Sequence, residues 1–85
     1  MASERINVLI VDDHPVFRDG LRQCLEARPG LHVVGAVAGG DEMWRALQAA
    51  SPRQPLPRIV LMDVEMPGDG GIELTQALHE KYPAI

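Results

Sequence analysis

Aspartates that directly follow apolar runs are the residues of this sequence with the clearest chemical potential. Asp63 follows the run Ile59–Met62, and Asp12 and Asp13 follow the run at residues 6–11. In open α/β sheets, ligands bind beyond the carboxyl ends of the strands, so an aspartate there projects into a crevice and not into the core. We therefore take Asp63 as the candidate reactive group and the acidic pair as its candidate partners.

These three carboxylates converge if the two runs form neighbouring strands. Like charges held close together repel one another unless a cation neutralises them. Mg²⁺ is the natural cation, because it prefers oxygen ligands and is commonly held by one or two carboxylates together with a phosphate. A carboxylate beside Mg²⁺ can attack phosphorus, and the product would be an aspartyl phosphate.

Each of these residues also has a simpler interpretation. Asp63 could be only a turn former, and Asp12 and Asp13, taken alone, could cap the helix that follows them. His14 lies beside the acidic pair, but no second histidine stands at metal-ligand spacing, so we interpret it as the start of a helix and not as a ligand.

The elements that must position these residues alternate along the chain. Strands are predicted over 6–11, 31–37 and 59–62, the last one buried on both faces because its four residues are all apolar. A first helix is predicted from Pro15 to the stop at Pro29-Gly30, with Phe17 and Cys24 on its buried side. A second helix ends by Ser51-Pro52 and a third before Pro83. Three βα units in series imply a parallel sheet with right-handed crossovers.

The composition is that of one ordinary globular domain, with 85 residues, 46% apolar and 24% charged. A formal net charge of −4 provides no positive field, so this segment by itself is not expected to bind nucleic acid or membrane. Cys24 is the only cysteine, which excludes an intrachain disulfide and favours a cytoplasmic location. The first residues are too short and too interrupted for a signal peptide or a membrane span.

Three stretches resemble the receiver domain of bacterial two-component response regulators. They are Val8–Pro15, which contains the acidic pair, Phe17–Leu21, and Val60–Gly68, which contains the Asp-x-x-Met-Pro loop. The resemblance covers nearly the whole chain, and the first two stretches most resemble the NarL/FixJ-type branch, which carries a C-terminal helix-turn-helix domain. It implies a flavodoxin-like (CheY-like) α/β fold, of which this chain holds the first three βα units.

The resemblance also implies roles for the acidic residues. Asp63 would be the phosphoacceptor for the phosphohistidine of a sensor histidine kinase. Asp12 and Asp13 would hold Mg²⁺, with Asp13 and the backbone carbonyl of Glu65 as direct ligands. After Pro67 and Gly68, which shape the next loop, the order Asp69-Gly70-Gly71-Ile72 departs from the family's Asp-Gly, so that loop is expected to bend differently.

Length is the larger departure from the family. A complete receiver has two further βα units, with a Ser or Thr and a Lys at their strand ends, whereas the only lysine here is Lys81. We therefore expect residues 1–85 to be a truncated receiver domain that reaches DNA only through a C-terminal output domain outside this chain. The third strand would be an open sheet edge, which favours self-association.

Three functions remain open from the sequence. The first is a phosphoacceptor receiver that is not a turnover enzyme and controls a DNA-binding output. The second is a Mg²⁺-dependent phosphatase with an aspartyl nucleophile and Glu65 as its general acid, although the acidic pair and Met66-Pro67 fit such enzymes poorly. The third is a partner-binding or self-associating module in which the acidic site is vestigial.

Overall fold

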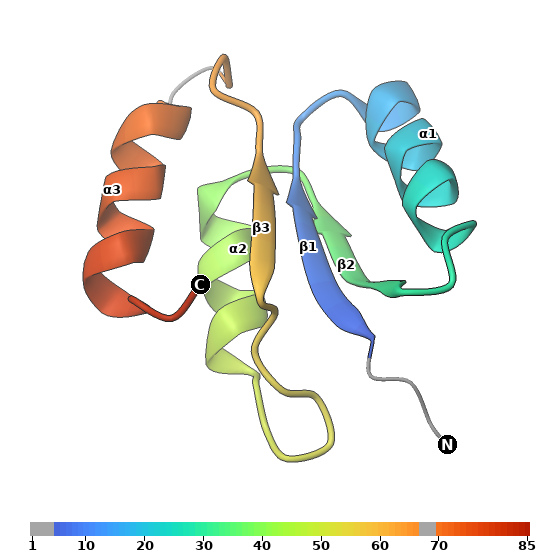
Figure 1. Ribbon diagram of the computed structural model, residues 1–85. Helices are drawn as coiled ribbons and strands as arrows, with labels where there is room; N and C mark the ends of the chain where they lie inside the picture. The colour runs from blue at the N-terminus through green and yellow to red at the C-terminus, as the bar shows by residue number, and fades with distance from the viewer. Residues whose placement is uncertain (1–4, 67–69) are drawn as a thin grey trace.

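The computed structural model describes residues 5–66 and 70–85. Strands and helices alternate along the chain, as predicted. In order they are β1 (Ile6–Val11), α1 (Pro15–Glu26), β2 (Leu31–Val37), α2 (Gly40–Gln48), β3 (Ile59–Met62) and α3 (Gly71–Lys81). The strands form one parallel sheet in the order β2-β1-β3 (Figure 1). The flavodoxin-like fold with three βα units is therefore confirmed.

The register of the sheet brings the ends of β1 and β3 to the same level. Val11 pairs with Met62 as the last pair of the two strands. The backbone bonding continues one residue further, because the Asp63 N–H donates to the Val11 carbonyl at 3.0 Å. On the other side of β1, the Asp12 N–H donates to the Val37 carbonyl at 3.0 Å. Both aspartates thus leave the sheet from fixed backbone positions.

One face of the sheet carries the main core. Successive strand residues point to opposite faces, and Leu9 and Val11 point to the side that α2 and α3 cover. They pack with buried side chains of both helices and of the loop after β3, which are Met43, Leu47, Met66, Leu74 and Leu78. This core holds α3 against β3 and so fixes the loop that carries Asp63.

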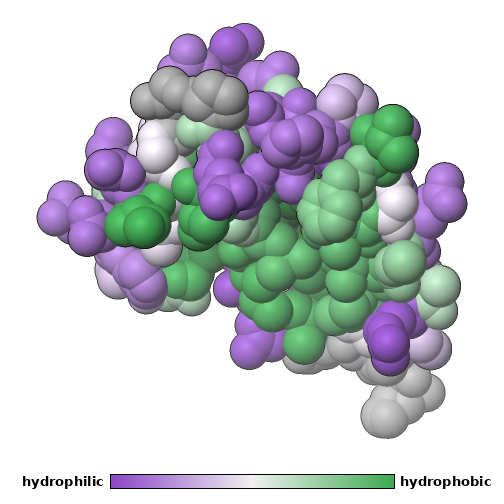
Figure 2. Space-filling model, turned by 90° about the horizontal axis from the view of Figure 1, so that it is seen from above, coloured by the Kyte–Doolittle hydropathy of each residue, from purple (hydrophilic) through white to green (hydrophobic). Residues whose placement is uncertain are grey.

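The opposite face, beside α1, is only partly covered. The prediction that Cys24 is buried is wrong, since Cys24 is exposed and none of the described residues of α1 is buried. Phe17 is 60% exposed. Apolar side chains gather there in a groove between α1 and β3, beside the polar residues at the strand ends (Figure 2). Helical spacing identifies the apolar side of α1, but α1 packs on β1 and β2 and leaves this side at most half-buried.

The prediction that β3 is buried on both faces is also wrong. Ile59 is 41% exposed and the other three residues of β3 are half-buried. Among the described residues β3 pairs only with β1, so it lies at an edge of the sheet and lacks cover on the side of α1. In the same described part of the chain, no helix is long and apolar enough to cross a membrane.

Candidate functional site

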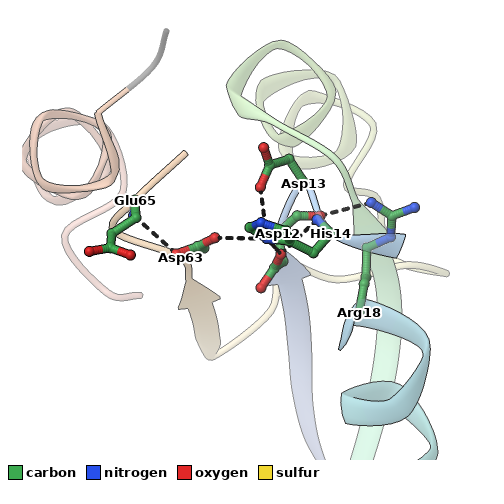
Figure 3. Close-up of polar contacts among 6 residues, drawn as sticks. All are labelled: Asp12, Asp13, His14, Arg18, Asp63 and Glu65. Carbon is green, nitrogen blue, oxygen red and sulfur yellow. Dashed lines mark hydrogen bonds and ion pairs between the residues drawn. The ribbon is translucent and has the colours of Figure 1, made fainter. Parts of the chain in front are cut away.

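Four side chains converge where β1 and β3 end (Figure 3). One potential ligand atom from each lies within 4.8 Å of the others, and the four residues are Asp12, Asp13, His14 and Asp63. The predicted convergence of three carboxylates at this edge is therefore confirmed. The parallel register of β1 and β3 creates the cluster, because it places residues from two distant segments at one sheet edge.

Asp12 is the most buried member of the cluster, with 7% of its side chain exposed. Its Oδ1 accepts the backbone N–H of His14 at 2.8 Å and lies 3.0 Å from the Nδ1 atom of the same residue. Its backbone carbonyl accepts a hydrogen bond from Arg18 Nη1 at 2.8 Å (Figure 3). These contacts fix the turn between β1 and α1 from both sides.

The simpler interpretation of Asp12 and Asp13 as caps of α1 is wrong. The N-cap residue of α1 is His14, and no side chain caps the helix. Pro15 at the first helical position needs no partner for its nitrogen, which removes one donor that a cap would otherwise satisfy. The acidic pair is therefore available to the crevice.

Asp13 contributes a carboxylate oxygen without a donor. Its Oδ1 atom is buried and has no hydrogen-bond partner among the described residues, although it lies 3.1 Å from His14 Nδ1. A buried oxygen in this state is costly unless a cation or another donor reaches it. The donor set of three converging carboxylates, with this unsatisfied oxygen, fits a hard divalent cation.

Asp63 uses its two carboxylate oxygens differently. Oδ1 accepts the backbone N–H of Glu65 at 3.0 Å, so the turn-forming interpretation is correct for this oxygen. Oδ2 points into the cluster and lies 3.5 Å from His14 Nδ1 (Figure 3). The side chain is 18% exposed. One oxygen thus anchors the group while the other faces the crevice. The predicted role of the Glu65 carbonyl as a ligand stays a prediction.

His14 is the member of the site that the sequence reasoning missed. It begins α1 as predicted, yet its imidazole turns back into the carboxylates. The hydrogen bond to Asp12 raises the His14 pKa above its ordinary value of 6.5, and the charges of Asp13 and Asp63 raise it further. Its place directly after the acidic pair was the available signal.

Comparison with known proteins decides the family. Residues 8–85 match the response regulator receiver domain. The chain belongs to this family. It is 42% identical over 80 residues to the response regulator GacA of Pseudomonas protegens, a match that covers 94% of this chain and 35% of that protein. The chain thus spans about a third of the length of such curated relatives.

Solved structures of response regulators share the fold. A LuxR-family response regulator from Aurantimonas sp. superposes with a TM-score of 0.80 and 37% identity, over 95% of this chain and 54% of that one. RcsB from Salmonella enterica, bound to promoter rprA in the presence of the phosphomimetic BeF3⁻, superposes with a TM-score of 0.81 and 28% identity, over 95% of this chain and 39% of that one.

In this receiver domain, Gly71 lets the start of α3 lie close to the backbone of Asp63. Gly71 is buried, and a Cβ atom on it would overlap the Asp63 carbonyl oxygen and the Val64 Cα, and would lie 2.9 Å from the Asp63 carbonyl carbon. The second glycine of the pair that departs from the family pattern therefore lets α3 begin directly against the backbone of Asp63.

Two other predicted features lie outside the cluster. Pro67 and Gly68 fall outside the described residues, so their role in the loop stays a prediction. Lys81 lies near the end of α3 with its Nζ 5.2 Å from the centroid of the Trp44 ring, and Trp44 in turn stacks on Tyr82 at 6.4 Å. The lysine thus contributes to packing between α2 and α3.

Proposed function

We propose that this receiver domain is a phosphoacceptor, and that Asp63 takes a phosphoryl group from the phosphohistidine of a sensor histidine kinase. The observation that carries the proposal is the different environment of the two Asp63 oxygens. Oδ1 accepts a hydrogen bond from the Glu65 N–H, and Oδ2 faces the acidic crevice. Membership of the receiver family supports the same role.

The transfer needs little from the protein besides position and charge compensation. Asp63 Oδ2 forms a bond to phosphorus, and the bond between phosphorus and the kinase imidazole nitrogen breaks with its electron pair going to that nitrogen. The product is an acyl phosphate on Asp63. The Glu65 N–H holds Oδ1 during the attack, so the carboxylate keeps one orientation.

Mg²⁺ is the proposed cofactor. Asp12 and Asp13, with Asp63 and the backbone carbonyl of Glu65, would hold it. When bound, the ion would offset the negative charge that builds up as an anionic phosphoryl group approaches three carboxylates. The hydrogen bond from Arg18 to the Asp12 carbonyl restrains the turn between β1 and α1, which carries two of these carboxylates.

In the whole protein, phosphorylation would control a DNA-binding output in the cytoplasm. The relative RcsB has been solved on a promoter with a phosphomimetic present, which supports this arrangement. On this proposal the domain is a stoichiometric acceptor and not a turnover enzyme. DNA would be contacted through the output domain, because the net charge of −4 of this segment repels phosphate.

The test is the intact mass of the chain after incubation with Mg²⁺ and phosphoramidate. One added phosphoryl group is expected in the wild type and in Asp41→Asn, an exposed matched control on α2, and none in Asp63→Asn. An adduct that persists in Asp63→Asn would contradict the assignment. Repeated release of phosphate from a simple ester would instead support the phosphatase alternative.

We further propose that two copies of this chain associate through the edge of β3. Beyond its pairing with β1, the strand presents backbone groups and Ile59, and the adjoining Val64 is 57% exposed. In sedimentation velocity, the weight-average sedimentation coefficient should increase with protein concentration. Ile59→Lys should weaken this association, whereas Ile72→Lys, at a 62% exposed position on α3, should leave it unchanged. A monomer at all concentrations would contradict the proposal.

A further inference from the structure

The imidazole of His14 occupies an unusual position for a residue that begins a helix. Its side chain is 65% exposed, yet Nδ1 points inward to the carboxylates and not to solvent (Figure 3). The distances from Nδ1 to the facing carboxylate oxygens are 3.0 Å for Asp12 Oδ1, 3.1 Å for Asp13 Oδ1 and 3.5 Å for Asp63 Oδ2.

These separations are those of neighbouring ligands around one ion. In an octahedral shell with ligands at about 2.1 Å, adjacent ligand atoms lie about 3.0 Å apart. Nδ1 stands at this separation from the Asp12 and Asp13 oxygens. The longer distance to Asp63 remains within the 4.8 Å that spans the whole donor set. With the proton of its hydrogen bond to Asp12 released to water, as metal binding requires, the nitrogen can therefore share a cation with the carboxylates without displacing any of them.

The backbone keeps the ring over the site. The His14 N–H is held by Asp12 Oδ1 at 2.8 Å, and Pro15 fixes the next backbone turn because its ring locks φ. Arg18, one helical turn later, ties α1 to the Asp12 carbonyl. The Cα of His14 is thus restrained on both sides, and the exposed ring needs only side-chain rotation to adjust to an ion.

We propose that His14 Nδ1 is a nitrogen ligand of the metal site, and that it shifts the preference of the site from Mg²⁺ towards transition-metal ions such as Co²⁺ and Zn²⁺. Imidazole nitrogen binds these ions well, whereas Mg²⁺ prefers oxygen ligands. A purely carboxylate site would lack this selectivity. The inference rests on the proposed metal site of the receiver and names its ion preference.

Calorimetric titration of the chain with Co²⁺ and with Mg²⁺, separately, tests the preference. His14→Ala should weaken Co²⁺ binding by about 10-fold or more, on the scale of removed metal-site partners, and should change Mg²⁺ binding by less than about 2-fold. His32→Ala and His79→Ala, at exposed positions on β2 and α3, should bind both ions as the wild type does.

A spectroscopic measurement tests the ligand itself. Pulsed electron paramagnetic resonance of the Mn²⁺-loaded chain should show a nitrogen coupling from a directly bound imidazole. The coupling should disappear in His14→Ala and persist in the His32 and His79 variants. Circular dichroism of each variant checks that the fold is retained, so a lost coupling reports on the ligand.

Results of three kinds would overturn the inference. In calorimetry they are no saturable Co²⁺ binding to the wild type, or Co²⁺ binding to His14→Ala that is unchanged. Tighter Mg²⁺ binding in His14→Ala would mean that the ring obstructs the site, and equal weakening of both ions would mean that His14 only holds the turn. In the resonance spectrum they are no nitrogen coupling in the wild type, or a coupling that persists in His14→Ala. Phosphorylation of Asp63 with Mg²⁺ is measured separately. An acceptor that works without nitrogen coupling rejects only this inference, and coupling without phosphorylation rejects only the proposed function.

Discussion

Adding one methyl group at Gly71 should destabilise this domain, whereas the same change at Gly70 should not. At Gly71 the atoms nearest to the new Cβ are backbone atoms, namely the Asp63 carbonyl group and the Val64 Cα. Backbone atoms cannot rotate away as a side chain can, so α3 or the loop after β3 must shift. At Gly70 the nearest atoms belong to the Glu73 side chain, which can move aside.

The expected change in the free energy of unfolding is the sum of opposing contributions. Overpacking typically costs about 1–3 kcal/mol, and contacts with backbone favour the upper half of that range. Alanine in place of glycine in a helix returns up to about 1 kcal/mol, so the net loss for Gly71→Ala is about 1–2 kcal/mol. For Gly70→Ala, the loss of a favourable N-cap residue and the reduced freedom of the unfolded chain nearly cancel, leaving a change within about 0.5 kcal/mol.

Urea denaturation followed by circular dichroism measures both free energies of unfolding. In a thermal scan, Gly71→Ala should lower Tm by about 4–16 °C, at about 4–8 °C per kcal/mol for a domain of this size. Equal stability of the two variants would contradict this prediction, because it would show that α3 does not pack tightly against the Asp63 backbone.

Two further predictions concern the turn between β1 and α1. Asp12→Asn should bring the metal-free His14 pKa down towards 6.5 in an NMR titration, since the hydrogen bond to Asp12 is the main cause of its raised value. Because the pKa of His14 is raised in the folded state, protonated His14 stabilises the fold fully below about pH 6.5, and this contribution is lost as pH rises through the raised pKa. If the free energy of unfolding of Asp12→Asn varied with pH as steeply as that of the wild type, this prediction would be contradicted. Arg18→Ala should lower the free energy of unfolding, measured by urea denaturation, by about 1 kcal/mol, because the hydrogen bond to the Asp12 carbonyl is lost. The exposed Arg22→Ala control should cost under about 0.5 kcal/mol, and equal losses would contradict the role of Arg18.

Much of the fold could be predicted because local patterns determine it. The run Ile6–Val11 and the run Ile59–Met62 are strands by composition, and each ends in an aspartate, so their parallel pairing was enough to bring Asp12 and Asp63 together. The element order needed only the spacing of apolar residues and the breaks at proline and glycine.

Tertiary packing decided what the sequence could not predict. Cys24 has helical spacing typical of a core residue, yet it is exposed, and no described residue of α1 is fully buried. The inward turn of the His14 ring depends on a rotamer that no periodicity encodes. The need for glycine at Gly71 arises from the backbone of Asp63, eight positions earlier in the chain, which a local pattern cannot reveal.

The most direct test of Asp63 as the phosphoacceptor is to locate the phosphoryl group chemically. Borohydride reduces an acyl phosphate to an alcohol, so an aspartyl phosphate at position 63 becomes homoserine with loss of phosphate. Peptide mass mapping after phosphorylation and reduction should find homoserine at position 63 and unmodified aspartate at positions 12 and 13. Homoserine at position 12 or 13, or a phosphoryl group on His14, would contradict the assignment of Asp63 as the acceptor.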